Sequence, residues 1–223
     1  MALGQRICVV TWDEQWTETK TIEKWLKPDE MVVQLARTLK VHGFTKAFDL
    51  GCGVGRHVLL LAREGYEVHA SDFSKPAVQY CQEWLRREEL TGIVIQKDMT
   101  EIPYPDGFFD LVIAYNVIYH TTFGGMKDLV QTVHRKLRPG GYFFVTLKSS
   151  EGWLYGQGVE IEKNTFLRPG KGVPVHFCTE NEITTLFCDF HLIDKKYRCY
   201  AAKRTKKRHA SWKIVLKKPS NIA

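Results

Sequence analysis

Short apolar runs and amphipathic segments alternate along most of this 223-residue chain. Apolar residues that recur at steps of three and four, as they do in 30–42, predict a helix, and short runs dense in apolar residues predict strands. By this pattern, helices are expected at 30–42, 55–64, 75–87, 125–136 and from Thr179, and strands at 46–50, 66–71, 92–96, 109–114, 141–148, about 191–200 and 210–217. Such alternation is typical of a mostly parallel sheet with helices on both faces, joined by right-handed crossovers.

Local signals at the ends of these elements support the assignment. Ser74 stands before a lysine and a proline, which predicts an N-cap with proline in the first turn. Gly65 suits the C-terminal cap of the helix before it. Thr179, with Glu182 three residues later, predicts a capping box. The last two strands are expected to form an antiparallel hairpin at the edge of the sheet.

Two segments do not follow this alternation of strands and helices. Residues 149–178 hold five glycines and two prolines with little periodicity, so we expect an irregular insertion on the substrate side, functional or mobile. Residues 1–43 contain Trp12, Trp16 and the helix predicted at 30–42. This N-terminal segment either closes over a ligand site as a lid or only packs against the rest of the domain.

Composition and length narrow the class of protein. A hydrophobic content of 44% with 12% aromatic residues indicates a packed globule rather than a disordered chain. A length of 223 residues is enough for one sizeable domain. We expect that single domain, 1–223, to consist of the N-terminal segment 1–43, a central region 44–148, the insertion 149–178, and a final helix and hairpin at 179–223.

The compartment can also be inferred from composition. No apolar run approaches the roughly 18 residues that a membrane span needs, and the N-terminus lacks a signal-peptide pattern. Six cysteines without a CxxC pair argue against a zinc site and against a secreted disulfide scaffold. We therefore expect a cytoplasmic protein with no metal and no membrane partner.

The net charge of +7 is unevenly distributed. Eleven Lys and Arg, and no Asp or Glu, lie between Lys195 and the end, which leaves the preceding 194 residues with a net charge of −4. The basic run at 203–208 is either a nucleic-acid contact or a solvated hairpin tip. We favour the solvated tip, because the basic residues flank strand-like runs and no series of aromatic residues interleaves with them.

Residues 48–56 read Phe-Asp-Leu-Gly-Cys-Gly-Val-Gly-Arg, between a predicted strand and a predicted helix. Glycines in such a turn let the backbone approach a bound nucleotide, and the helix N-terminus attracts an anion. Asp72, nineteen residues after Gly53, suits the hydroxyls of a ribose. The dinucleotide fingerprint has its third glycine at the sixth place. Here Arg56 stands at that place and the glycine comes one residue early, at Gly55, which disfavours a nicotinamide oxidoreductase.

With Asp49 just ahead of it, this spacing resembles the first motif of class I S-adenosylmethionine (SAM)-dependent methyltransferases. Further segments that resemble the same superfamily are Val94–Met99, Phe108–Ala114 with the following Tyr115–His120, Leu137–Tyr142, and the closing hairpin. The runs GCGVGRHVLLLAREGYEVHASDFS and PVHFCTENEITTLFCDF are similar to the small bacterial enzymes of the type 11 and tellurite-resistance group. The resemblance implies a Rossmann-like, doubly wound α/β fold with seven strands, mostly parallel, and an antiparallel last strand.

The resemblance also implies that SAM is the cofactor and S-adenosylhomocysteine the product. Asp49 would orient the ammonium of SAM, Asp72 would bind the ribose and Asp98 the adenine amine, although the last two also suit a helix cap and a turn. The implied cofactor-binding residues are Asp49, Gly51, Cys52, Gly53, Asp72, Phe73, Asp98, Met99 and Tyr115. Cys52 is expected to fit as a small packing residue rather than as a nucleophile.

Catalysis by such an enzyme depends chiefly on alignment, because methyl transfer is an in-line displacement. The candidate catalytic residues are Asn116, Tyr119 and His120, beyond the fourth strand, where ligands bind in open α/β sheets. His120 is either a general base or a packing histidine, and His176 is a further candidate base.

The acceptor is inferred by elimination. The residues after the fourth strand do not form the Pro-Pro-aromatic stretch of enzymes that methylate DNA bases, nor the acidic pair of protein-arginine enzymes. No clear set of carboxylates suggests a catechol-type metal site. A small-molecule acceptor is therefore favoured. The alternatives are an RNA methyltransferase that uses the basic hairpin and a SAM-binding protein without catalysis.

Overall fold

The computed structural model describes residues 12–17, 22–167, 172–202 and 205–220. The described helices are α1 (Trp12–Gln15), α3 (Glu30–Val41), α4 (Arg56–Arg63), α5 (Lys75–Arg87), α6 (Phe123–Lys136) and α7 (Glu180–Leu186). The strands are β1 (Lys46–Leu50), β2 (Glu67–Asp72), β3 (Ile93–Gln96), β4 (Phe109–Ala114), β5 (Leu137–Ser149), β6 (Val159–Glu162), β7 (Thr165–Leu167), β8 (Pro174–Cys178), β9 (His191–Ala201) and β10 (Arg208–Lys217). Every helix and strand expected from the sequence is present.

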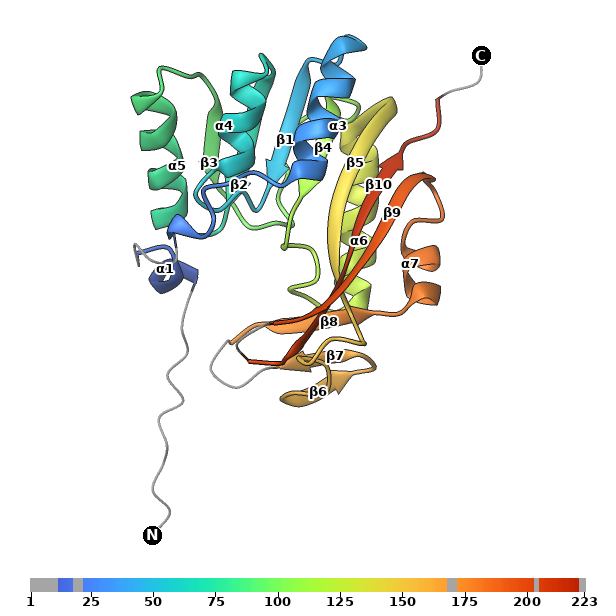
Figure 1. Cartoon of the computed structure of the whole chain (residues 1–223). Coiled ribbons are helices and arrows are strands. Elements are labelled where there is room, and N and C mark those ends of the chain that lie inside the picture. The colour runs from blue at the N-terminus through green and yellow to red at the C-terminus, as the bar shows by residue number, and fades with distance from the viewer. Residues whose placement is uncertain (1–11, 18–21, 168–171, 203–204, 221–223) are drawn as a thin grey trace.

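The central sheet has the predicted architecture (Figure 1). Strands β3, β2, β1, β4 and β5 lie side by side in that order, and each neighbouring pair is parallel. β10 runs antiparallel to β5 and to β9, so it is the reversed strand expected from the closing hairpin. Strand order changes direction at β1, and this is where ligands bind in open α/β sheets.

The insertion 149–178 is less irregular than the sequence suggests. It contains β6, β7 and β8, which extend the sheet to ten strands instead of the expected seven. The outer edge of β5 pairs with β10 over Tyr142–Lys148 and with β8 over Lys148–Ser149. Strands of three to five residues are too short to show a clear period, so only their pairing reveals them.

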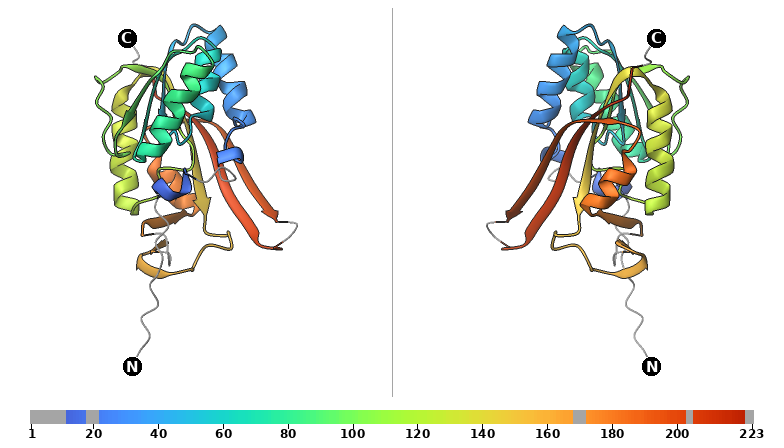
Figure 2. Two further views of the ribbon diagram at one scale, coloured as in Figure 1. Left: turned by 90° about the vertical axis from the view of Figure 1, so that its left-hand side faces the viewer. Right: turned by 90° about the vertical axis from the view of Figure 1, so that its right-hand side faces the viewer.

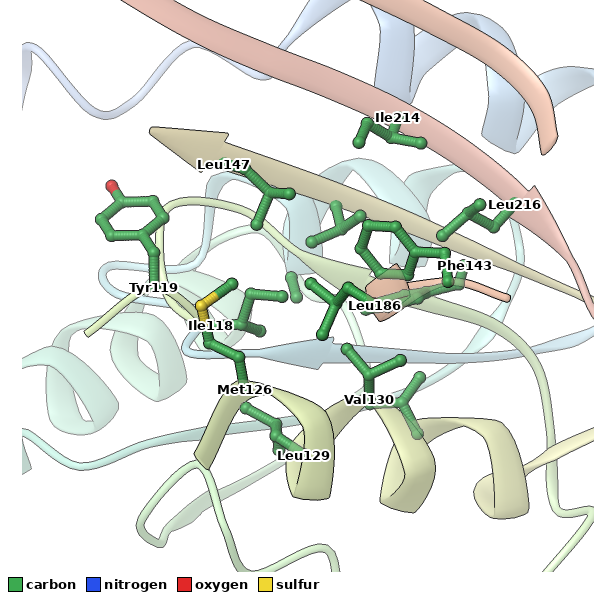
Figure 3. Close-up of a cluster of buried hydrophobic side chains, with 14 of the residues drawn as sticks. Ile118, Tyr119, Met126, Leu129, Val130, Phe143, Leu147, Leu186, Ile214 and Leu216 are labelled. Atoms are coloured by element: carbon green, nitrogen blue, oxygen red, sulfur yellow. The ribbon is translucent and has the colours of Figure 1, made fainter. Parts of the chain in front are cut away.

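Helices cover both faces of the sheet, as predicted (Figure 2). α3, α4 and α5 pack on one face around a core that includes Val58, Leu61 and Phe144. α6 and α7 pack on the other face, where Ile118, Met126, Phe143 and Leu186 belong to one buried cluster (Figure 3). Within the described part of the chain, no helix is both long enough and apolar enough to cross a bilayer.

The predicted caps are present. The Ser74 hydroxyl accepts a hydrogen bond from the Ala77 N–H at the start of α5, and Thr179 and Glu182 form a complete capping box at α7. Gly65 follows α4 with a left-handed φ of 78°. Each cap stops or starts a helix beside the sheet and so determines where the next loop leaves it.

Candidate functional site

A cavity of about 550 Å³ lies at the carboxyl end of the parallel strands. Each of the five parallel strands contributes a residue from its end or from the loop that follows, and the N-terminal segment adds Trp12, Trp16 and Trp25. The volume is typical of pockets that bind small organic molecules. All twelve residues predicted as catalytic or cofactor-binding line it, namely Asp49, Gly51, Cys52, Gly53, Asp72, Phe73, Asp98, Met99, Tyr115, Asn116, Tyr119 and His120.

The glycine-rich turn between β1 and α4 forms the floor of this cavity. Gly51 has a left-handed φ of 66°, and a Cβ atom added to it would lie 2.4 Å from Cγ2 of Val117. The turn is further held by a hydrogen bond that the Cys52 N–H donates to the Ser71 carbonyl at 3.0 Å. A side chain at Gly51 would therefore push apart the loops that follow β1 and β4.

Asp49 is the most unusual ionisable group of the cavity. Its side chain is 1% exposed, and Oδ2 has no hydrogen-bond partner among the described residues. Burial raises the pKa of this carboxyl to about 8, although the nearby Arg56 opposes the shift. A buried carboxylate is costly unless a cation accompanies it. The position is therefore suited to a ligand that carries a positive charge.

Two further carboxylates line the same end of the cavity. Asp72 accepts hydrogen bonds from the N–H groups of Gly53 at 2.7 Å and Ser74 at 2.9 Å. Burial raises the pKa of Asp72, against the effect of these two bonds. Asp98 accepts from both the N–H and the hydroxyl of Thr100. Both residues thus have the structural role of a cap or turn and also face the cavity.

Phe73 and Met99 follow these two carboxylates along the chain. Phe73 is 61% exposed, which is high for a phenylalanine, and both side chains line the cavity. An exposed aromatic ring and a thioether beside a cavity offer apolar surface to a flat heterocycle. This end of the cavity therefore combines hydrogen-bond acceptors with stacking surface.

The opposite end is formed by the loop after β4, which alternate residues of β5 hold in place. The ring of Phe144 is parallel to that of Tyr115, with centroids 6.1 Å apart. The hydroxyl of Thr146 accepts a hydrogen bond from the Asn116 N–H at 2.7 Å and donates to its Oδ1 at 3.2 Å. This pair of bonds accompanies the left-handed φ of 62° at Asn116.

The next residue on that face of β5, Lys148, has its ammonium 5.3 Å from the centre of the Tyr119 ring. Burial raises the pKa of the Tyr119 phenol, which is 3% exposed. The Tyr115 hydroxyl donates to Oδ2 of Asp29 at 3.0 Å, and burial raises its pKa to about 12. Neither phenol is ionised at neutral pH, so both contribute as neutral groups.

Aromatic residues of the N-terminal segment complete the wall. The Trp12 ring meets the ring of His120 edge to face, with centroids 4.9 Å apart. Trp16 packs over the glycine-rich turn, 3.1 Å from where a Cβ of Gly53 would lie. The Arg56 guanidinium lies over Trp25. The tryptophans therefore contact residues from the two ends of the cavity, while closure as a lid stays a prediction.

Asp29 fastens this segment to the body. It caps α3 by accepting from the Met31 N–H, and it forms an ion pair with Lys213 of β10. Its own N–H donates to Nε2 of His57 at 3.2 Å. Burial lowers the pKa of His57 to about 3, so this imidazole is neutral and can accept that bond. His57 lines the cavity but serves to hold the segment.

The structure corrects one candidate and adds others. His176 does not line the cavity: it is fully buried, Nδ1 lies 2.7 Å from the Thr165 hydroxyl, and its ring stacks on Phe123. It is a core histidine. Arg56 and Lys148, in contrast, line the cavity although the sequence assigned them no role. Arg56 directly follows the glycine-rich turn, and this position could have identified it from the sequence. No sequence pattern points to Lys148.

Comparison with known proteins agrees with this geometry. Residues 48–145 match the family model of the type 11 methyltransferase domain. An uncharacterized methyltransferase of Synechocystis, sll0829, is 31% identical over 125 residues, which cover 54% of this chain and 56% of that protein. The tRNA N(3)-methylcytidine methyltransferase Mettl2 of Drosophila melanogaster is 28% identical over 153 residues, which cover 61% of this chain and 45% of that protein. The chain thus spans about half the length of these curated relatives.

Solved structures share the fold. A SAM-dependent methyltransferase from Methanosarcina mazei superposes with a TM-score of 0.68 at 21% identity, over 81% of this chain and 97% of that one. TehB from Haemophilus influenzae gives 0.66 at 17% identity, over 86% and 62%. The 1,6-didemethyltoxoflavin-N1-methyltransferase of Burkholderia thailandensis, solved with its acceptor and S-adenosylhomocysteine, gives 0.63 at 19% identity, over 86% and 80%.

Residues 48–145 thus match a methyltransferase domain of the type 11 group, and they lie in a fold that class I SAM-dependent methyltransferases share. The predicted superfamily and the predicted cofactor class are thereby confirmed.

We predict that Asp49→Asn stabilises the ligand-free protein and weakens its binding of SAM. The folded-state pKa of about 8 lies above the ordinary value of 3.8, so the wild type loses stability as pH rises between these values. The difference in unfolding free energy between Asp49→Asn and the wild type should grow over that range by at most about 1.4 kcal/mol per pH unit. Urea unfolding at pH 5.5 and 8 measures this.

The affinity for SAM, measured by calorimetry, should fall about tenfold or more, because Asp49 is the residue predicted to pair with the ammonium of SAM. Asp128→Asn, which removes an exposed acid on α6, is the control for both measurements. An Asp49→Asn protein that binds SAM as tightly as the wild type would contradict the predicted contact between Asp49 and the ammonium of SAM.

Proposed function

We propose that this protein transfers the methyl group of SAM to a small-molecule acceptor. The buried carboxyl group of Asp49, on the floor of a cavity lined by the twelve residues predicted as catalytic or cofactor-binding, is the observation that carries the proposal. It supports a ligand with a positive charge at this point, and the amino acid end of SAM has an ammonium group.

The residues present fit SAM in one orientation. Asp49 would pair with the ammonium, and the N-terminus of α4 with Arg56 would attract the carboxylate. Asp72 would accept hydrogen bonds from the ribose hydroxyls. Asp98 would bind the adenine amine, with Phe73 and Met99 against the ring. Gly51 and Cys52 would form the floor through their backbone.

When bound, SAM supplies a methyl group already activated by a positively charged sulfonium. The protein then needs to align an acceptor and to exclude water, which can lower the barrier by roughly 7–11 kcal/mol. The loop Tyr115–His120 is suited to alignment, because β5 holds it through Phe144 and Thr146. The tryptophans of the N-terminal segment are suited to shielding the site.

The proposal is tested by calorimetric titration with SAM and S-adenosylhomocysteine, followed by transfer of labelled methyl to thiol, amine, hydroxyl and selenium acceptors. Both cofactor forms should bind in the micromolar range or better, and one class of small acceptor should be methylated. If millimolar concentrations of either form fail to bind, the proposal is refuted. Binding without turnover on any acceptor class would favour a SAM-binding protein without catalysis.

His120 is the candidate general base, and its position beside Trp12 keeps its ring at the cavity wall. We predict that His120→Ala lowers kcat about 100-fold for hydroxyl acceptors, which hold their proton at neutral pH. Thiol acceptors should lose much less, because they ionise readily. His42→Ala, an exposed histidine after α3, is the control. Unchanged turnover of hydroxyl acceptors across pH 6–9 would exclude His120 as the base.

An RNA acceptor is the second candidate, favoured by the hairpin of β9 and β10. On one face of the hairpin the Tyr200 and His209 rings stack with centroids 5.2 Å apart, and the Arg198 guanidinium lies 5.0 Å from the Tyr200 ring. Aromatic residues therefore do interleave with basic ones here, contrary to the reading of the sequence. Figure 2 shows the hairpin projecting beyond the body.

This candidate predicts that the affinity for single-stranded RNA falls steeply with salt, with a slope of about 0.7 for each phosphate contact. Arg198→Gln and Tyr200→Ala should each weaken binding, whereas Lys163→Gln, in the β6–β7 turn, should not. Fluorescence anisotropy at 50 and 200 mM salt measures the effect. Affinity that neither variant changes would remove the RNA hypothesis.

A further inference from the structure

We infer that the methyl acceptor has an apolar body, which packs against an apolar wall formed by Leu154, Val173 and Val175 of the insertion. All three residues line the cavity described above. The inference rests on the proposed function, because it concerns the acceptor end of the same cavity and names the kind of molecule that this end recognises.

The order of the strands separates the apolar wall from the residues proposed to bind SAM. The three carboxylates proposed to contact SAM lie in, at the end of, or after β1, β2 and β3, on one side of β4 in the sheet. The loop with the candidate catalytic residues follows β4, and β5 and β8 come next in the order. Val175 is a residue of β8. The apolar wall is therefore separated from the proposed SAM site by the β4 loop, on the side available to an acceptor.

Buried aromatic residues pack beside the apolar wall. Val175 is 5% exposed and pairs with Phe166 of β7. Phe166 and Phe177 belong to the same buried cluster as Val175, and the Tyr155 ring meets these two rings edge to face, with centroids 5.2 and 5.7 Å away. Leu154 packs against this cluster. Since close-packed side chains resist displacement, the wall has a defined shape against which the size of an acceptor can be measured.

The chemistry of the apolar wall determines what can bind to it. Leu154 and Val173 are partly exposed, so a ligand can cover surface that water contacts in the free protein, which favours binding. All three side chains of the wall are aliphatic and offer no hydrogen bond. A polar group placed against them would lose its water without gaining a partner.

The polar side chains at this end of the cavity interact within the protein. Asn116 is bonded to the hydroxyl of a β5 threonine, and the ammonium of Lys148 lies over the Tyr119 ring. His120 meets a tryptophan ring of the N-terminal segment edge to face. These groups belong to the β4 loop and β5, whereas the wall belongs to the insertion. The acceptor is therefore expected to direct its nucleophile toward the β4 loop and its apolar body toward the wall.

The experiment uses homologous acceptor probes whose apolar part grows by one methylene at a time. The series run from ethanethiol to hexanethiol, from 4-methylphenol to 4-pentylphenol, and from 4-methylaniline to 4-pentylaniline. Binding to the full chain saturated with S-adenosylhomocysteine is measured by calorimetry, and methyl transfer is followed separately. In at least one series the affinity of the wild type should rise about three- to fourfold per methylene until the wall is covered. An ether oxygen in place of one methylene should weaken binding about tenfold.

Leu154→Gln should flatten this rise, because it places an amide in the wall, while the affinity for S-adenosylhomocysteine stays within about twofold of the wild type. Leu154→Ala should keep the rise and lengthen the best-bound chain by about two carbons, because it opens space for them. A purely structural loss would not lengthen that optimum. Leu192→Gln and Leu192→Ala are the matched controls, because Leu192 is exposed on β9 and is not among the described residues that line the cavity.

Val173→Thr provides a second variant of the wall that conserves side-chain volume. It should weaken binding of the longer probes and leave the shortest probes unaffected, because only a long chain reaches the added hydroxyl. Val159→Thr is its control, because Val159 is 67% exposed on β6 and is not among the described cavity residues.

Failure of this inference is separable from failure of the proposed function. Affinities that do not rise with chain length in any of the three series, or a rise that Leu154→Gln leaves unchanged, would overturn the inference even if polar acceptors are methylated. A rise that Leu192→Gln flattens as much as Leu154→Gln would place the apolar contact elsewhere and would also overturn it. Loss of S-adenosylhomocysteine binding in the wild type would instead refute the function.

Discussion

The structure depends on the turn between β1 and α4, whose three glycine positions leave no room for a side chain. Each glycine of this turn faces a different element: Gly51 faces Val117 after β4, Gly53 faces Trp16 of the N-terminal segment, and Gly55 faces Cys81 of α5. A Cβ at Gly55 would lie 2.2 Å from the Cys81 sulfur. The three close approaches bring the loops of β1 and β4, the N-terminal segment and a flanking helix to one point, and the cavity lies beside it.

Polar interactions then join the segments that surround this turn. Asp29 contacts α3, the β4 loop and β10 through Met31, Tyr115 and Lys213. Burial alone would raise the pKa of Asp29, but the bond and charge of Lys213 outweigh it and leave the pKa lowered. The carboxylate is therefore ionised and structural. Asp49 forms no such ion pair among the described side chains, and the nearby charge of Arg56 does not outweigh its burial.

The contrast between these two aspartates illustrates how the site can differ from the rest of the fold. Asp110, another buried aspartate, is satisfied within the protein, because it accepts hydrogen bonds from the N–H groups of Thr45 and Lys46. Asp49 instead has a strongly raised pKa, which costs stability at neutral pH. Such a cost is common where a group must recognise a charged ligand.

The order of strands and helices, their caps and the residues of the glycine-rich turn were all determined by local sequence, because each depends on neighbours within a few positions. Strand period, Ser74 and the Thr179–Glu182 box are signals of this kind. Only the tertiary structure decided that β6, β7 and β8 extend the sheet, that His176 is buried away from the cavity, and that Lys148 joins it. These outcomes depend on pairings between segments far apart along the chain, and no local pattern encodes them.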